Sequence, residues 1–214
     1  LPQNITDGTG EGAIIENHLE DSGVWPANEA SGECSHAEGF STGASGNQAH
    51  SEGQNTKATG RDSHAEGQGT EATGTYSHAE GYNAKATGMS SHAEGSASQA
   101  TADSAHAEGG QTRANGSCSH AEGSYTKATH KAQHVFGEYN IVDTSENAAN
   151  KRGTYIEIVG NGTPSVSRSN ARTLDWDGNE ALAGSLTLGM GTGSETTITA
   201  EQLAQLLALL EGGD

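Results

Sequence analysis

Histidine and glutamate recur as a pair, two residues apart, along much of this chain. The stretch SHAEGQGTEATGTYSHAEG contains His64 with Glu66 and, fourteen residues later, His78 with Glu80. An imidazole beside a carboxylate is typical of metal sites and of acid–base pairs in enzymes. Almost every neighbouring residue is Gly, Ala, Ser or Thr. The pair therefore either performs chemistry or supports a repeated structure.

The pair keeps one register over eight repeats. Glutamate follows each histidine by two residues except in the last repeat, where Phe136 takes its place. The set is His36, Glu38, His50, Glu52, His64, Glu66, His78, Glu80, His92, Glu94, His106, Glu108, His120, Glu122 and His134. A repeat of constant length predicts a solenoid, in which each repeat forms one coil and pairs with its neighbours.

Each repeat contains two segments in which every second residue is small. One segment surrounds the histidine, as at Ala65 and Gly67, and the other centres on an alanine eight residues after the histidine, such as Ala72. Alternation with period two is typical of β-strands, whose side chains point to opposite faces. We therefore expect two short strands per coil, with the small residues filling a flat, narrow interior.

The two outer faces of the predicted coil differ in how much they vary. Seven residues after the histidine, the other strand presents Gly43, Lys57, Glu71, Lys85, Gln99, Arg113 and Lys127. Such variation is expected of a solvated face, whereas the His and Glu positions stay constant until the last coil. An interior of small residues buries little apolar area, so a packed outer face must add stability. We predict that the His–Glu face packs against further copies of the chain.

Two interpretations of this His–Glu ladder are open. Ladders from three chains could bind Zn, Ni or Fe ions along an axis. Alternatively, each imidazole forms a hydrogen bond with a carboxylate from a neighbouring coil or chain, which fixes the register. We favour the second, because the pattern offers seven equivalent positions and no special one, and we predict no metal or cofactor. Buried pairs of this kind predict a stability that changes between about pH 5 and 8.

Composition limits the partners. The formal net charge is -18 with only 10 Lys and Arg, which disfavours nucleic acid and anionic membranes. No segment approaches the ~20 apolar residues of a membrane span. A hydrophobic content of 31% would suit a disordered chain, but the strict repeat argues against disorder. Cys34 and Cys118 share one phase, and at ~4.8 Å per coil they are too far apart for a disulfide.

The fourteen-residue unit SHAEG followed by T-x-A-x-G resembles the head repeat of trimeric autotransporter adhesins. The same SHAEG variety resembles repeats in tail fibre and receptor-binding proteins of bacteriophages and phage-tail-like particles. The match covers residues 34–137 and implies an all-β fold, a left-handed parallel β-roll that assembles as a homotrimer. In adhesin heads the corresponding outward positions are typically aliphatic, whereas this chain has His and Glu there.

The composition changes after the roll. In residues 153–162, Ile156 and Ile158 alternate with Tyr155 and Val159 as in a strand, and the segment ends on an Asn-Gly turn. Residues 171–189 predict a strand, an Asp177-Gly178 turn and a second strand. That second strand would place Leu182, Leu186 and Leu188 on one face. This stretch resembles segments near the C-termini of phage tail fibres, which favours the phage assignment.

The last residues predict a helix. Thr199 and Gln202 match a capping box. The stripe Leu203, Leu206, Leu207 and Leu210 follows at helical spacing. An isolated helix of about twelve residues is marginally stable in water. We therefore expect these leucines to form the core of a three-helix bundle.

The expected organisation has four parts. These are a lead-in at 1–33 with Trp25 as a candidate cap, the roll at 34–137, a β-rich module at 138–193 and a coiled-coil helix at 194–214. Because the first residue is Leu1, we expect an upstream portion that joins other tail proteins. The expected function is non-catalytic: a structural and receptor-binding part of a virion tail that recognises a receptor, of the carbohydrate class, on a bacterial surface. Tyr139, Tyr155 and Trp176 are the candidate receptor-binding residues, because aromatic rings stack on sugars.

Two alternatives stay open: a trimeric adhesin on a bacterial cell surface, and a tail-associated polysaccharide depolymerase. Glycoside hydrolysis needs a special pair of carboxylates. Asp175, Asp177 and Glu180 cluster near Trp176, but the predicted turn accounts for the Asp-Gly step. No nucleophile elbow, P-loop or CxxC motif is present in the sequence. We therefore predict no catalytic residues and no enzymatic activity.

Overall fold

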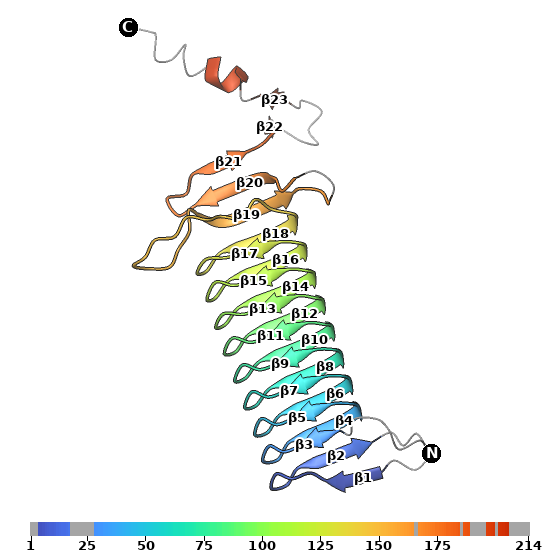
Figure 1. Ribbon diagram of the computed structural model, residues 1–214. Helices are drawn as coiled ribbons and strands as arrows, with labels where there is room; N and C mark the ends of the chain where they lie inside the picture. The colour runs from blue at the N-terminus through green and yellow to red at the C-terminus, as the bar shows by residue number, and fades with distance from the viewer. Residues whose placement is uncertain are drawn as a thin grey trace.

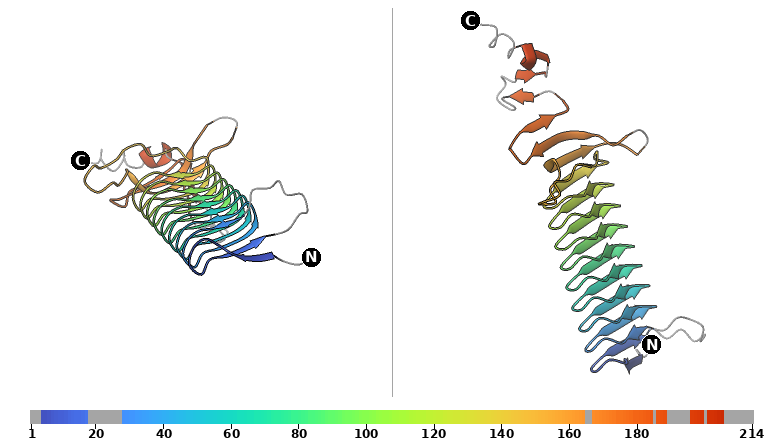
Figure 2. Two further views of the ribbon diagram at one scale, coloured as in Figure 1. Left: turned by 60° about the horizontal axis from the view of Figure 1, so that its bottom comes forward. Right: turned by 60° about the vertical axis from the view of Figure 1, so that its left-hand side comes forward.

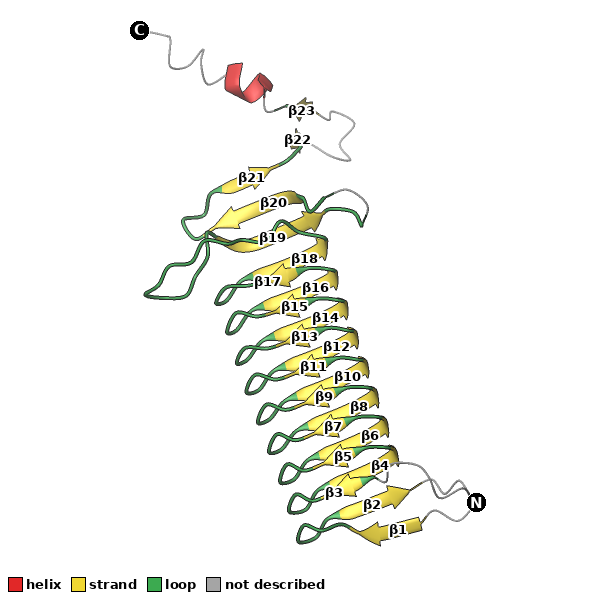
Figure 3. Cartoon of the chain, viewed as in Figure 1, coloured by secondary structure: helices red, strands yellow, loops and turns green. Residues whose placement is uncertain are grey.

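The chain folds into an elongated β-solenoid, with β1 near one end and the later strands beyond the other (Figure 1). The computed structural model describes residues 4–17, 28–164, 167–184, 186–188, 196–199 and 201–205. In these residues the strands form a 13-stranded, an eight-stranded and a two-stranded sheet. Figure 2 shows the stack of coils from two further directions, and Figure 3 shows the short loops that join the strands at both edges.

The large sheet carries one longer strand from each coil. Its strands are β1 (Asn4–Asp7), β2 (Ile14–Asn17), β4 (His36–Phe40), β6 (His50–Gln54), β8 (His64–Gln68), β10 (His78–Tyr82), β12 (His92–Ser96), β14 (His106–Gly110), β16 (His120–Ser124), β18 (His134–Glu138), β19 (Tyr155–Asn161), β20 (Asn170–Asp175) and β21 (Glu180–Leu182). The eight-stranded sheet contains β3 (Glu29–Ala30), β5 (Gly43–Ala44), β7 (Lys57–Ala58), β9 (Glu71–Ala72), β11 (Lys85–Ala86), β13 (Gln99–Ala100), β15 (Arg113–Ala114) and β17 (Lys127–Ala128). The two-stranded sheet pairs β22 (Leu186–Leu188) with β23 (Thr196–Ile198).

Consecutive coils pair in parallel and in register. His64 of β8 lies opposite His78 of β10, and Glu66 lies opposite Glu80. This pairing confirms the predicted parallel solenoid with a fourteen-residue repeat. Parallel pairing also extends beyond residues 34–137, to β2 before the repeats and to β19 after them.

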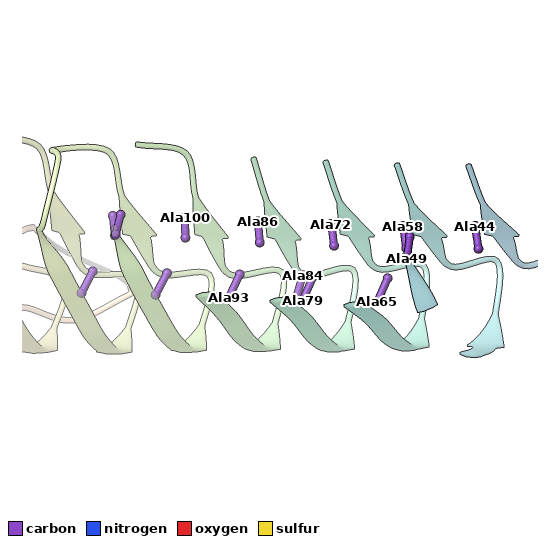
Figure 4. Close-up of a cluster of buried hydrophobic side chains, with 14 of the residues drawn as sticks. Ala44, Ala49, Ala58, Ala65, Ala72, Ala79, Ala84, Ala86, Ala93 and Ala100 are labelled. Atoms are coloured by element: carbon purple, nitrogen blue, oxygen red, sulfur yellow. The ribbon is translucent and has the colours of Figure 1, made fainter. Parts of the chain in front are cut away.

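Small side chains fill the interior of the roll, as predicted. The two rows of alanine in Figure 4 come from the two sheets and point toward each other. The fully buried members include Ala37, Ala44, Ala58, Ala65, Ala72, Ala79, Ala86, Ala93, Ala100, Ala107, Ala114, Ala121 and Ala128. Because only the small side chains of alanine, serine and threonine lie between the sheets in most coils, the backbones of each coil lie close together.

Each coil turns through residues in the left-handed conformation. Most of these are not glycine, as at Ala97 with φ 56° and Ala132 with φ 55°. Left-handed backbone costs an L-residue roughly 1–2 kcal/mol, because Cβ approaches the carbonyl oxygen. The turns therefore hold strain that the pairing of the coils must offset.

Replacing Ala132 by glycine is expected to stabilise the protein by about 0.5–1 kcal/mol. The substitution relieves the left-handed strain, and the greater freedom of glycine in the unfolded chain cancels part of the gain. Ala132 is exposed, so little packing is lost. The control is Ala128→Gly, in a strand and fully buried, which should lower stability by about 1 kcal/mol. Urea midpoints measure both effects; a lower midpoint for Ala132→Gly would refute the strain argument.

The loop between β18 and β19 closes the last coil with buried polar groups. Asp143 accepts hydrogen bonds from the backbone N–H groups of Tyr155 at 3.1 Å and Ser145 at 3.1 Å. The hydroxyl of Ser145 donates to the same carboxylate at 2.7 Å. His130 lies beside it, with Nδ1 3.9 Å from Oδ2 of Asp143 and both side chains buried. This polar cluster ends the repeat, which otherwise exposes unpaired backbone groups.

The segment after the roll departs from parallel pairing. β19 pairs antiparallel with β20, and β20 with β21, which confirms the predicted hairpin around Gly178. Leu182 lies in β21, but Leu186 and Leu188 lie in β22 of another sheet, so the single strand face expected for these leucines is wrong. The prediction rested on the alternate spacing of these leucines. That spacing does not indicate where one strand ends and the next begins, or which sheet each strand joins.

A short helix follows β23. Thr199 and Gln202 form the predicted capping box: each backbone N–H donates to the other side chain, at 3.0 and 3.2 Å. The helix spans residues 201–205, and Leu203 is 47% exposed. Leu206, Leu207, Leu210 and Trp25 lie outside the described residues. No described helix has the length and apolar character needed to cross a membrane.

Candidate functional site

The ladder histidines stack along one outer face of the large sheet. Each is the first residue of its strand, and the register places identical rings above one another. The ring centroids of His64 and His78 are 4.8 Å apart with an angle of 3° between the rings. The stack runs from His36 to His134. Because Ala alternates with His and Glu along each strand, both polar side chains point outward together.

The imidazoles of His50, His106 and His120 each lie within 4.0 Å of two carboxylates. Nε2 of His106 is 3.7 Å from Oε1 of Glu94, one coil back, and 3.9 Å from Oε2 of Glu108 in its own coil. Nε2 of His120 repeats this arrangement at 3.8 and 3.9 Å. These separations exceed a hydrogen bond. The direct hydrogen bond expected between neighbouring coils is thus not formed here, and a bond between chains stays a prediction.

The Nε2 atoms are also shielded from solvent. In the described residues, Nε2 of each of the following is buried and has no hydrogen-bond partner: His50, His64, His78, His92, His106, His120 and His134. The imidazole and carboxylate groups as a whole are about one third exposed. A buried polar atom without a partner costs about 1–3 kcal/mol. The face therefore lacks a partner that supplies a proton, a lone pair or an ion.

The glutamates form a second column in which the carboxyl groups share protons. Hydrogen bonds to the carboxyls of Glu38 and Glu66 raise the pKa of Glu52 to about 7. Hydrogen bonds to the neighbouring glutamates likewise raise the pKa of Glu80 and that of Glu108 to about 7. The same bonds lower the pKa of Glu66 and that of Glu94, which hold the charge. Carboxyl groups stacked one per coil cannot all ionise together.

Burial lowers the pKa of the ladder histidines, in contrast to the raised pKa of three of the glutamates. Desolvation lowers the pKa of His64, and the neighbouring imidazoles of His78 and His50 lower it further. Desolvation is also the main cause of the lowered pKa of His50, His92, His106 and His120. Their contribution to stability is complete above 6.5, the unfolded pKa, and decreases as pH falls below it.

The three glutamates with raised pKa affect the pH dependence of stability in the opposite way to the histidines. In the folded chain they bind protons up to about pH 7, but in the unfolded chain only to about 4.5. Their stabilising contribution is therefore complete at low pH and is lost as pH rises through about 7. Between pH 6.5 and 8 the three glutamates should therefore contribute a fall in melting temperature. This fall opposes a rise from the histidines, whose unfolded forms, with a pKa of 6.5, still lose protons in this range.

The variant Glu52→Gln/Glu80→Gln/Glu108→Gln should abolish this fall and be more stable than wild type at pH 8. A gain on the order of 1 kcal/mol per site is expected after solvent screening. Thermal melts in EDTA at each pH test this, with Glu71→Gln on the other sheet as the control. A triple variant whose melting temperature follows that of wild type from pH 6.5 to 8 would contradict the raised pKa of these glutamates.

A groove of about 730 Å³ runs along the glutamate column. Its walls and floor are Glu52, Glu66, Glu80, Glu94, Glu108, Gly67, Gly81, Gly95, Gly109 and Gly123. The glycines lack side chains, so the carboxyl groups border an open trough. The groove gives ions or a partner surface direct access to the ladder.

The predicted receptor-binding aromatics have structural contacts. Tyr139 stacks on Tyr125 with centroids 4.4 Å apart. Trp176 donates from Nε1 to the carbonyl of Gly153 at 3.1 Å, and the guanidinium of Arg152 covers its ring at 4.1 Å. Tyr155 packs against the alanine core. The three aromatics are partly buried, and their role with sugars stays a prediction.

The carboxylates near Trp176 shape a turn. Asp175 accepts hydrogen bonds from the backbone N–H of Asp177 at 2.9 Å and of Asn179 at 2.8 Å. The Asn179 side chain also donates to it at 2.9 Å, and these bonds lower the pKa of Asp175. Glu180 pairs with Arg172 at 2.8 Å. Each carboxylate in this cluster except Asp177 thus has a structural partner within the hairpin.

Sequence reasoning missed the polar cluster of Asp143, His130 and Ser145. Its signal was present, because His130 occupies the position that is glycine at Gly74 and Gly116 in earlier coils. No protein-family model and no curated protein matches this chain. Function must therefore be argued from the geometry of the ladder.

Proposed function

We propose that the chain is a non-catalytic, structural and receptor-binding segment of a homotrimeric phage tail fibre or phage-tail-like particle. The observation that carries the proposal is the constant His–Glu face, on which the buried Nε2 atoms from His50 to His134 make no hydrogen bond with the described residues. Packing that face around a threefold axis would bring three ladders together and supply the missing contacts. Trimeric β-rolls of this kind are stiff rods, which suits a fibre that must hold a binding site away from a particle.

The other outer face supports the receptor-binding part of the proposal. Its residues vary along the roll between neutral, acidic and basic, with Glu71 paired to Lys85 at 2.9 Å while Lys57 and Arg113 are exposed. Such a face stays available in a trimer built on the ladder. A bacterial surface carbohydrate is the receptor class that we propose, and other tail proteins are the further partners that we propose.

Binding of labelled protein to bacterial cells and to their isolated polysaccharide tests the receptor-binding role. Saturable binding to some strains and not others, without release of reducing sugar, is expected. Release of reducing sugar would identify a depolymerase instead.

The variant Trp176→Ala tests the proposed aromatic contact in the same binding assay. The matched control is Tyr76→Ala, at a roll residue that is 50% exposed.

A further inference from the structure

We infer that the His–Glu ladder binds divalent first-row transition-metal ions such as Zn²⁺ between consecutive coils of one chain. Each site would take three ligands from two consecutive coils, either two imidazoles and the carboxylate between them or one imidazole and the carboxylates on either side of it. The group Glu80, His92 and Glu94 has one ligand atom from each residue, all within 4.8 Å of one another. All ligands of a site come from a single chain, so the inference does not depend on trimer formation.

The distances between imidazole nitrogen and carboxylate oxygen suit two ligands of one ion better than a hydrogen bond. Nε2 of His92 is 3.7 Å from Oε1 of Glu80. Two ligand atoms that are each ~2.0–2.1 Å from zinc lie about 3.4 Å apart at a tetrahedral angle and about 4.1 Å apart when opposite. The ladder distances of 3.7 to 4.0 Å fall between these limits. An ion could therefore enter with small side-chain rotations and no movement of the backbone.

The ladder also lacks another partner for the metal-binding atom. Nε2 of His92, like that of His106, is buried and makes no hydrogen bond in the described residues. Imidazole nitrogen is a preferred ligand of zinc, nickel and copper. An ion would give this nitrogen a partner and would neutralise carboxylates that now crowd one another.

Each carboxylate can bridge two sites. Oε2 of Glu108 faces His106 at 3.9 Å, and Oε1 of the same group faces His120 at 3.8 Å. Carboxylate bridges allow ions to lie as close as about 3.5–4 Å in two-metal sites, and consecutive coils are spaced more widely, at 4.8 Å between ring centroids. A row of ions is therefore electrostatically acceptable.

The donor set indicates the class of ion. Nitrogen together with carboxylate oxygen suits zinc, nickel, cobalt and iron, whereas magnesium and calcium favour oxygen alone. Four groups that share no residue can be formed among the described residues. They are His36, Glu38 and His50; His64, Glu66 and His78; Glu80, His92 and Glu94; and His106, Glu108 and His120. We therefore expect four ions per chain at saturation.

The test begins with the full chain after EDTA and desalting have removed bound metal. Zn²⁺ is then added, and calorimetry and elemental analysis measure how many ions bind per chain. Wild type is expected to retain about four Zn²⁺ per chain and to melt at a higher temperature with zinc. The variant His92→Gln/His106→Gln should retain about two, and Glu71→Gln about four. Fewer than one Zn²⁺ per chain in wild type, or equal binding by the histidine variant, would overturn the inference.

Cobalt supplies a readout that needs no variant. Co²⁺ bound by nitrogen and oxygen in the ladder should give visible absorption bands that Zn²⁺ removes, and their absence would count against the sites. Light scattering in EDTA and in zinc separates this inference from the proposed function. A monomer that binds four ions would support the ion sites and contradict the trimer, whereas an ion-free trimer would do the reverse.

Discussion

Replacing Gly67 by alanine is expected to destabilise the protein by about 3 kcal/mol or more. Gly67 has φ +103°, and a Cβ added there would lie 2.2 Å from the backbone oxygen of Gly81 in the next coil. The left-handed strain costs about 1–3 kcal/mol, and forcing the coils apart costs a similar amount. The contact is with backbone, so no side-chain rotation can relieve it. The same glycine recurs in every repeat because coil pairing requires the close approach.

Gly110 provides a matched control in a strand of the same sheet. A Cβ at that position would meet nothing within 4 Å, and its φ is not positive. Gly110→Ala is therefore expected to change stability by less than about 0.5 kcal/mol. Urea unfolding followed by circular dichroism measures both variants. Equal midpoints for Gly67→Ala and Gly110→Ala would show that the glycine column is not what sets the coil spacing.

Replacing Asp143 by alanine is expected to cost about 3 kcal/mol. The carboxylate is 3% exposed and accepts hydrogen bonds from the backbone of Tyr155 and from both donors of Ser145. The exposed Ser145 can turn to water, but the buried side-chain amide of Gln133, 3.5 Å from the carboxylate, and the half-buried N–H of Tyr155 would lose their acceptor. A buried donor without an acceptor costs about 1–3 kcal/mol. The loss should open the end of the roll first, so the amide of Tyr155 should exchange with solvent faster than amides in β10.

Glu146 lies in the same loop and serves as the control. It is 45% exposed and pairs with Lys151 at 2.9 Å. An exposed ion pair contributes about 0–1 kcal/mol, so Glu146→Ala should be close to wild type. Hydrogen exchange and urea unfolding together measure the pair of variants. Wild-type exchange at Tyr155 in Asp143→Ala would mean that the cluster does not close the roll.

The repeat made the roll predictable from sequence. Small residues at alternate positions around His64 and Ala72 required two strands and a narrow interior, and the constant spacing fixed the register. The Asp177-Gly178 turn and the Thr199 capping box were predictable for a similar reason, since each depends on a few adjacent residues.

Features that depend on distant or single residues were not predictable. The pairing of β22 with β23 and the partners of Asp143 occur once, so no periodicity predicts them. His130 at a glycine position of the repeat marks where the pattern changes, but not which groups it contacts. A repeat in the sequence also cannot predict whether an imidazole and a carboxylate lie at hydrogen-bond distance or 3.7 Å or more apart, as they do in the ladder. The sequence placed the ladder on one face, but only the structure shows that the Nε2 atoms from His50 to His134 make no hydrogen bond with the described residues.

The most direct test of the account is the mass of the protein in solution, measured by light scattering after size-exclusion chromatography in EDTA. A His–Glu face that packs against two further copies predicts about three times the 21.8 kDa chain mass at micromolar concentration. A negative charge introduced into the ladder, such as His78→Glu, should lower that mass, whereas Lys57→Glu on the other face should not. A mass of one chain for wild type, across the concentrations tested, would contradict the trimer and with it the proposed function of the ladder.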